Sequence, residues 1–265
     1  MARAREREDK PMSDFLTRTD ASPPHWASEQ IEAWDDRKLR LHGSFIRRHY
    51  WTDCGSLNVF CVRGTEHPDY QGLTWHEFLH RGKRMDRNIP LLESNPDYYL
   101  GTERKFPSMY YNSYNGLDWF IGADGNHRTG LARFLFHERQ MAYLHGLCLN
   151  HYEFDNAFLE AYLVLCEELR FHAAQGFYMD LEVTRVPESR RDTAGWKTDL
   201  FSTALRFSAG AGTREVLPAN IPQSVTVREP AAARELLGAL QAWRDARQRA
   251  SRGGLLNRLL RRASR

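Results

Sequence analysis

Five consecutive residues, Asp124, Gly125, Asn126, His127 and Arg128, combine groups that suit phosphate chemistry. Arginine offers a planar fork of donors that fits phosphate oxygens, and histidine can donate a hydrogen bond or transfer a proton near neutral pH. Glycine lets the backbone approach a ligand closely. Aspartate can cap a helix, orient its neighbours or help to coordinate a divalent cation. The segment therefore predicts an anion site in which Asp124, His127 and Arg128 are the chemically active residues.

The flanking sequence predicts the elements that hold this segment. Residues 108–114 and 117–122 favour two β-strands, and the Asn-Gly pair at 115–116 between them is a strong hairpin signal. The second strand runs directly into residues 124–128, and the apolar spacing that follows predicts a helix over 129–145. A helix start exposes unpaired amides and the positive end of the dipole, which bind anions. The alternative is a plain Asp-Gly turn capped by Asn126, without a ligand.

Residues 107–136, PSMYYNSYNGLDWFIGADGNHRTGLARFLF, resemble the core of the ParB/sulfiredoxin superfamily, in which a strand pair leads into a His-Arg turn at a helix N-terminus. The resemblance covers about residues 73–185. It implies an α+β fold with a mixed sheet and helices, plus accessory N- and C-terminal segments. It also implies a bound nucleotide, ATP or CTP, with Mg²⁺ held in part by Asp124. The residues expected to contact the nucleotide are Gly125, Asn126, His127, Arg128 and Thr129.

Members of the superfamily include CTP-binding partition proteins, free-serine kinases, sulfiredoxins and plasmid fertility-inhibition proteins of the Osa type, which are ATPases and DNases. The resemblance implies nucleotide hydrolysis, with nuclease activity, in plasmid transfer, fertility inhibition or partition. Arg128 would stabilise the transferring phosphoryl group and His127 would act as acid or base. The alternative is a non-catalytic, nucleotide-gated DNA-binding regulator. Sulfiredoxins have a reactive cysteine where this chain has Asn126, which argues against sulfinic-acid reduction.

A second motif, His76-Glu77-Phe78-Leu79-His80, matches the zincin pattern His-Glu-x-x-His. In a metalloprotease, His76 and His80 would bind zinc from one helix face and Glu77 would be the general base. Glycines at 72 and 82 confine the predicted helix to a short segment, which argues against that function. A zinc metalloprotease therefore stays the lesser alternative.

Two basic stretches could contact DNA phosphates, which require only positioned positive charge. The first comprises Arg81, Lys83, Arg84 and Arg87. The second is the C-terminal tail, where leucines alternate with Arg258, Arg261, Arg262 and Arg265. A solvated surface and a frayed tail are the alternatives.

The 265 residues carry a net charge of only +3, so a broadly basic nucleic-acid binder is excluded. The four cysteines have neither zinc-ligand nor disulfide-framework spacing, and no apolar run is long enough for a membrane span; we expect a cytoplasmic protein. The predicted organisation is a flexible arm over 1–27, the nucleotide-binding domain over 28–186, an irregular segment over 187–230, and a C-terminal helix and basic tail over 231–265. Within these, helices are expected over 28–37, 73–81, 90–100, 156–174 and 231–249, and strands over 57–62, 147–152 and 179–186.

Overall fold

The computed structural model describes the backbone of residues 13–263 and the side chains of residues 13–251. Contacts within the chain divide it into two compact units, each assembled from three separate stretches. The first unit comprises Met1–Asp36, His49–Tyr152 and Arg191–Thr198, and the second comprises Arg37–Arg48, Glu153–Arg190 and Asp199–Arg265.

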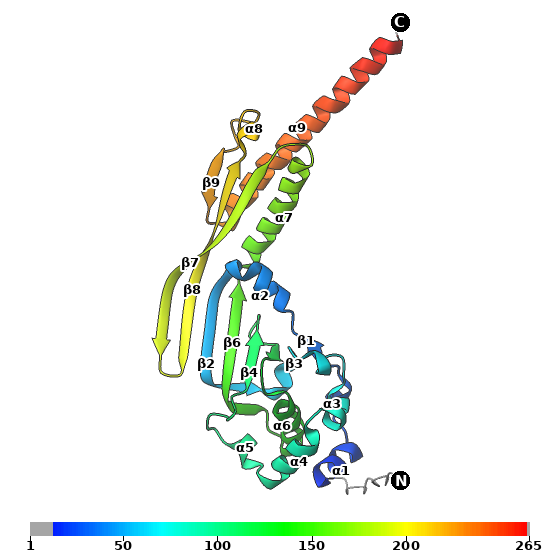
Figure 1. Cartoon of the computed structure of the whole chain (residues 1–265), viewed down its shortest axis with the longest axis vertical. Coiled ribbons are helices and arrows are strands. Elements are labelled where there is room, and N and C mark those ends of the chain that lie inside the picture. Colours follow the sequence, from blue (N-terminus) through cyan, green and yellow to red (C-terminus); the bar gives the residue numbers. More distant parts are fainter. Residues whose placement is uncertain (1–12, 264–265) are drawn as a thin grey trace, which may run out of the picture. The chain divides into compact units, whose positions relative to one another are not determined.

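The first unit holds most of the short elements (Figure 1). Its helices are α1 (Asp14–Ala21), α3 (Trp75–Arg81), α4 (Met85–Ser94), α5 (Asp97–Leu100) and α6 (Asn126–Arg139), with 3₁₀ turns at His25–Ser28, Val59–Cys61 and Pro68–Tyr70. Its strands are β1 (Glu32–Ala33), β3 (Val62–Thr65), β4 (Tyr110–Ser113) and β5 (Trp119–Ile121).

The second unit contains α7 (Asn156–Ala173), α8 (Ala211–Arg214), β9 (Ser224–Val227), all of α9, nearly all of α2 and a 3₁₀ turn at Gly43–Phe45. Helix α9 spans Pro230–Ala263, and α2 spans Asp36–His42. Four long strands have residues in both units: β2 (Ile46–Asn58), β6 (Tyr143–Phe154), β7 (Met179–Thr193) and β8 (Trp196–Ala209).

The strands pair in a mixed pattern. Within the described residues the order is β1-β3-β5-β4-β6-β2-β8-β7, with β9 beside β8. The pairs β1–β3, β3–β5 and β4–β6 are parallel, whereas β4–β5 and β8–β9 are antiparallel. The predicted α+β class with a mixed sheet is therefore confirmed.

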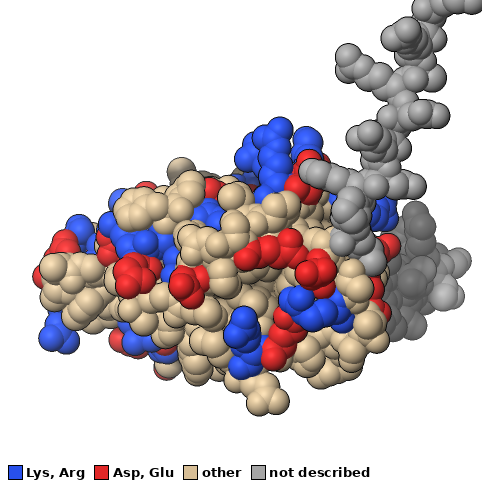
Figure 2. All heavy atoms as spheres, turned by 90° about the horizontal axis from the view of Figure 1, so that it is seen from below, with Lys and Arg blue, Asp and Glu red and all other residues tan. Residues whose placement is uncertain are grey.

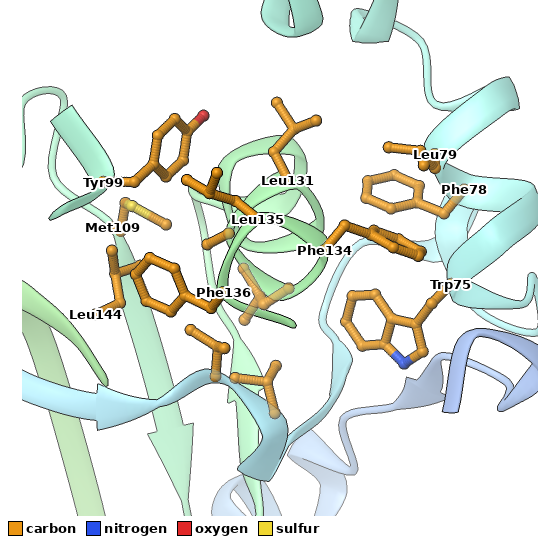
Figure 3. Packing of buried hydrophobic residues seen from close by; sticks show 14 of the residues in the cluster. Trp75, Phe78, Leu79, Tyr99, Met109, Leu131, Phe134, Leu135, Phe136 and Leu144 are labelled. Atoms are coloured by element: carbon orange, nitrogen blue, oxygen red, sulfur yellow. The ribbon is translucent and has the colours of Figure 1, made fainter. Parts of the chain in front are cut away.

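Helix α6 is the central helix of the first unit's core. Its residues from Thr129 to Phe136 are all buried, so the helix has neighbours on every side. In Figure 3, the side chains of α3 approach α6 on one side, and those from α5 and the strands approach it on the other. The labelled residues are Trp75, Phe78, Leu79, Tyr99, Met109, Leu131, Phe134, Leu135, Phe136 and Leu144. Burying these apolar groups fixes α6, and with it the segment that opens the helix.

Several predicted elements are confirmed because local signals specify them. Thr74 and Glu77 form a capping box at the start of α3, and the Asp155 side chain caps α7. The predicted hairpin is the antiparallel pair β4–β5, with Gly116 at φ 74° in the turn. The helix predicted over 90–100 is split into α4 and α5 around residues 95–96, and α4 begins earlier, at Met85.

Three predictions near the N-terminus are wrong. The part of the 1–27 arm that is described, residues 13–27, contains α1 and a 3₁₀ turn, and Phe15 of α1 is only 1% exposed. In place of a helix over 28–37 there is the short strand β1, followed by the start of α2. Residues 57–62 are not one strand, because the turn Val59–Cys61 separates β2 from β3. Residues 1–12 lie outside the described residues.

The segment 187–230 is not irregular, since it contains the end of β7, all of β8, and β9. From residue 187 to 193 every residue of β7 is exposed, so this part of the strand lacks the alternation that marks a half-buried strand. The helix expected to end near residue 249 continues as α9 to Ala263, through the glycines at 253 and 254. The helix expected over 129–145 instead begins at Asn126 and ends at Arg139.

Candidate functional site

The segment 124–128 lies at the N-terminus of α6, as predicted. Gly125 occupies the N-cap position with φ 122°, a backbone conformation that residues other than glycine rarely adopt. No side-chain hydrogen bond caps α6, so the amides of its first turn have neither an intrahelical partner nor a capping side chain. An anion placed there would accept hydrogen bonds and meet the positive end of the helix dipole.

The side chains of Asn126 and Thr129 face the protein interior. Asn126 Oδ1 accepts a hydrogen bond from the Thr65 hydroxyl at 2.5 Å. The Thr129 hydroxyl lies 2.6 Å from that of Tyr111 and donates to Gly125 O at 2.7 Å. These bonds anchor the helix start. Both residues were expected to contact the nucleotide. Only the backbone amide of Asn126 is placed to do so, because the Thr129 amide donates to Gly125 O at 2.8 Å.

The Arg128 guanidinium has four partners within the protein. Its side chain is 12% exposed, and Nη1 donates to the Tyr98 hydroxyl at 2.7 Å and to the carbonyl of Pro107. Nη2 donates to Ser108 O at 3.3 Å and lies 3.1 Å from Asp124 Oδ2. The guanidinium that was predicted to bind phosphate is therefore already bonded to groups of the protein. Arg128 joins the start of α6 to the segment before β4.

His127 is half-buried beside the same helix end. Its Nε2 lies 3.2 Å from the Tyr70 hydroxyl, and its ring stacks on Phe78 with centroids 5.6 Å apart. Burial, followed by the positive charge of Arg84, lowers the pKa of His127. The imidazole is therefore mainly neutral at pH 7 and can accept a proton.

Asp124 is the exposed acidic group of the segment. Its side chain is 54% exposed, and Oδ1 accepts from the Gly125 amide at 2.6 Å while Oδ2 pairs with Arg128. Among the described side chains, the cluster with metal-binding geometry is Asp20, His76 and His80, and it does not include Asp124. The predicted metal role of Asp124 thus has no second protein ligand beside it.

A pocket of about 450 Å³ opens next to this segment. Arg84, the N-cap residue of α4, and Arg87 of α4 line it together with Asp124, His127 and Arg128, so positive charge predominates. Its apolar wall includes two strongly exposed side chains, Leu91 at 64% and Phe106 at 70%. We call this the α4–α6 pocket; its lining residues are Arg84, Arg87, Asn88, Leu91, Asn95, Tyr98, Tyr99, Phe106, Pro107, Asp124, His127 and Arg128.

The sequence did not identify the apolar part of this pocket. Arg84, Arg87 and Leu91 are spaced i, i+3 and i+7, which places them on one face of α4 and is a signal that could have been used. Phe106 precedes β4 in a segment without periodicity, and only the fold brings it to α4. The cationic stretch was predicted to contact DNA phosphates, and the structure places Arg84 and Arg87 in the pocket.

The four residues of this stretch, Arg81, Lys83, Arg84 and Arg87, are all exposed. On the face seen in Figure 2, basic and acidic side chains are interspersed among uncharged surface. A mixed surface of this kind does not favour a broad phosphate-backbone interface. The second predicted DNA contact, the C-terminal tail, lies outside the described side chains. The structure describes only the backbone of Arg258, Arg261 and Arg262, and Arg265 lies beyond the described backbone.

The zincin-like motif lies on α3, a helix of seven residues. His76 and His80 are one turn apart, with ring centroids separated by 4.7 Å. Glu77 Oε2 accepts from the amide and the hydroxyl of Thr74, at 2.8 and 3.1 Å. The carboxylate that a metalloprotease would use as base therefore caps the helix.

None of the described helices combines the length and apolarity needed to cross a bilayer. Comparisons with protein-family models, with curated proteins and with solved structures gave no significant match. The resemblance to the ParB/sulfiredoxin superfamily accordingly stays a prediction.

Proposed function

We propose that this protein binds a nucleoside triphosphate, ATP or CTP, in the α4–α6 pocket. One observation carries the proposal. The N-terminus of α6, which no side chain caps, lies in the same pocket of about 450 Å³ as Arg84 and Arg87. That volume lies within the range of small-molecule sites, which usually combine apolar walls with a few convergent polar groups.

The two sides of the pocket suit the two parts of a nucleotide. Phosphate oxygens would accept from the first amides of α6 and pair with the exposed arginines of α4. The base would lie against Phe106, Leu91 and Tyr98, because aromatic and aliphatic surfaces stack favourably on a planar ring. Arg128 would hold the helix start in place. A triphosphate normally carries Mg²⁺, and Asp124 is the exposed carboxylate nearest the helix start that could add a ligand to it.

Hydrolysis of the bound nucleotide is the second candidate function, and the state of His127 favours it. A half-buried imidazole with a lowered pKa is neutral at pH 7 and can take a proton from an attacking water. The superfamily resemblance favours coupling of such turnover to DNA processing in plasmid transfer, fertility inhibition or partition, and the composition of the sequence favours a cytoplasmic location. Binding without turnover would leave the nucleotide-gated DNA-binding regulator.

The binding proposal is tested by equilibrium titration with fluorescent ATP, CTP and GTP in the presence of Mg²⁺. Replacing Arg84 or Arg87 with Gln removes a charge-assisted hydrogen bond, and we expect the dissociation constant to rise about tenfold for each. Arg81→Gln is the matched control, since Arg81 belongs to the same exposed stretch but does not line the pocket. The proposal fails if no nucleotide binds at millimolar concentration or if all three variants bind alike.

Turnover is measured on the same proteins by phosphate release. We expect His127→Gln to abolish release while the dissociation constant changes less than about threefold. Unchanged release in His127→Gln would remove this residue from the chemistry. Binding without any release in the wild-type protein would leave only the regulator.

A further inference from the structure

Three metal-ligating side chains meet on the first unit, away from the residues that line the α4–α6 pocket. Asp20 comes from α1, and His76 and His80 come from α3. Asp20 Oδ1 lies 2.9 Å from Nε2 of His76 and 2.9 Å from Nε2 of His80. The three ligand atoms all lie within 4.8 Å of one another. Two imidazole nitrogens therefore converge on one carboxylate oxygen.

This spacing is close to that of a coordination shell. Zinc bonds to nitrogen and oxygen are about 2.0 Å long, so the edge of a tetrahedron of ligands is about 3.3 Å. The two N–O separations need to widen by only about 0.4 Å to accept an ion. The imidazoles lie at i and i+4 on one helix, an arrangement that directs both rings to the same point.

The donor set and the exposure define the class of ion. Two imidazoles and a carboxylate suit zinc and neighbouring divalent transition metals better than magnesium or calcium, which prefer oxygen ligands. The side chains of Asp20, His76 and His80 are 30%, 39% and 31% exposed, so water can reach a fourth position. Glu77 is not part of the set, because its carboxylate caps α3.

We propose that Asp20, His76 and His80 bind a zinc-class divalent ion that joins α1 to α3. Other contacts already hold α1: Phe15 is buried, its amide donates to Glu93 Oε1 at 2.9 Å, and Arg18 lies 3.4 Å from Glu138. The ion adds a link at the opposite end of the helix from Phe15. Its role is to stabilise the docked position of α1, and it does not depend on the nucleotide proposal.

The test starts with chelator-treated full-length protein titrated with Zn²⁺ by calorimetry. We expect one ion per chain, and a dissociation constant that rises at least about tenfold in Asp20→Asn and in His80→Gln. Glu77→Gln is the matched control within the motif, since glutamine preserves the capping box. His25→Gln controls for loss of an exposed histidine elsewhere in the first unit. Absence of stoichiometric binding, or equal weakening in Glu77→Gln, would overturn the proposal.

A measurement on the wild-type protein keeps the test independent of variant folding. Hydrogen exchange with and without Zn²⁺ should show slower exchange in residues 14–21 and 75–81, because the ion joins these two helices. Co²⁺ in place of Zn²⁺ should give the absorption bands of a tetrahedral site with nitrogen and oxygen ligands. Protection located elsewhere, or none, contradicts the assignment of the ion to α1 and α3.

Discussion

At the scale of single residues, Arg128 shows how the setting of a side chain decides its role. An arginine at a helix start suggests a phosphate ligand, but here its two terminal nitrogens donate to a hydroxyl, two carbonyls and a carboxylate. A guanidinium with so many partners stays in one position, and moving it would leave these acceptors without their donor. Arg128 therefore positions the α4–α6 pocket, and the exposed Arg84 and Arg87 supply mobile charge.

Arg128→Lys is expected to lower the free energy of unfolding by about 2 kcal/mol, because an ammonium cannot reach four acceptors in the geometry of the fork. Denaturant unfolding measures the loss. Arg87→Lys, on the exposed face of α4, is the control and should unfold like the wild type. Wild-type stability combined with lost nucleotide binding in Arg128→Lys would show that Arg128 is a ligand after all.

Gly125→Ala is expected to lower the free energy of unfolding by about 1 to 3 kcal/mol and to weaken nucleotide binding. The cause is the φ of 122°, which strains any residue with a Cβ, and the new methyl would also lie 3.2 Å from Met109 Cβ. Gly212→Ala is the control, because that position has open space around it and no positive φ. Equal stability of the two variants, from thermal and denaturant unfolding, would contradict the strain assigned to the helix start.

At the scale of elements, α6 has to be buried and also present its N-terminus to the α4–α6 pocket. Its middle carries a buried cation, Arg133, which is 1% exposed and lies between the rings of Trp26 and Trp75 at 4.5 and 4.1 Å. Nη1 donates to the carbonyls of Val59 and Val62. Burial lowers the pKa of Arg133 to about 9, so the group stays charged at neutral pH. Arg133 thereby joins α6 to the turn between β2 and β3.

Arg133→Ala should therefore be among the most damaging single changes in the first unit, at about 3 to 5 kcal/mol. The variant opens a cavity between two tryptophans and leaves two buried carbonyls without donors. Arg139→Ala, an exposed position at the end of the same helix, should change stability by less than about 0.5 kcal/mol. Chemical denaturation followed by tryptophan fluorescence measures both, and similar effects would refute a structural role for Arg133.

At the scale of the whole molecule, each compact unit draws on three stretches of chain. A fragment ending at residue 186 would lack Gly195, whose carbonyl accepts from the Thr52 hydroxyl at 2.7 Å and whose neighbours complete the first unit.

The second unit contains its own buried polar network. His172 of α7 is fully buried; its Nδ1 accepts from Arg247 at 2.7 Å, and its Nε2 lies 3.3 Å from the Leu240 carbonyl. The contact with Arg247 requires a neutral imidazole, because a protonated ring has no lone pair on Nδ1 with which to accept.

This network predicts acid sensitivity. Burial, with the charge of Arg247 second, lowers the pKa of His172 to about 4, against about 6.5 in the unfolded chain. Below pH 6.5 the unfolded chain binds a proton that the folded chain does not. The free energy of unfolding is therefore unaffected above about pH 7 and falls as the pH drops from about 6.5 to 4. The fall due to this residue between pH 7 and 5 is about 2 kcal/mol.

The contribution of His172 is isolated by comparing wild type with His172→Gln in urea titrations at pH 7 and 5. The neighbouring Glu168 acts in the opposite direction near pH 5, because burial raises its pKa and the folded state then holds the proton more tightly. Glu168 is present in both proteins, and glutamine at position 172 keeps an amide beside its carboxylate, which lies 3.2 Å from His172 Nε2. A smaller pH-dependent loss in His172→Gln is expected, and an equal loss in both proteins would contradict a neutral His172.

The sequence alone determined the elements whose signals are local. The Asn-Gly hairpin, the helix start at Gly125 and the apolar periodicity of α7 each depend on residues within a few positions of one another, so spacing was enough to predict them. The continuation of β7 past residue 186 was missed because residues 187–193 are exposed on both faces and their sequence carries no alternation.

Only the tertiary structure decided which of these features act together. Asp20 is 56 residues from His76 in the sequence, and Phe106 lines the same pocket as residues of α4 from a separate segment. No local spacing in the sequence predicts that either pair lies close together. The same holds for Arg128, since its acceptors at Tyr98, Pro107 and Ser108 precede it by 20 to 30 positions. Residue type and spacing determine what a side chain can do, whereas its partners depend on which distant segments the buried core brings into contact.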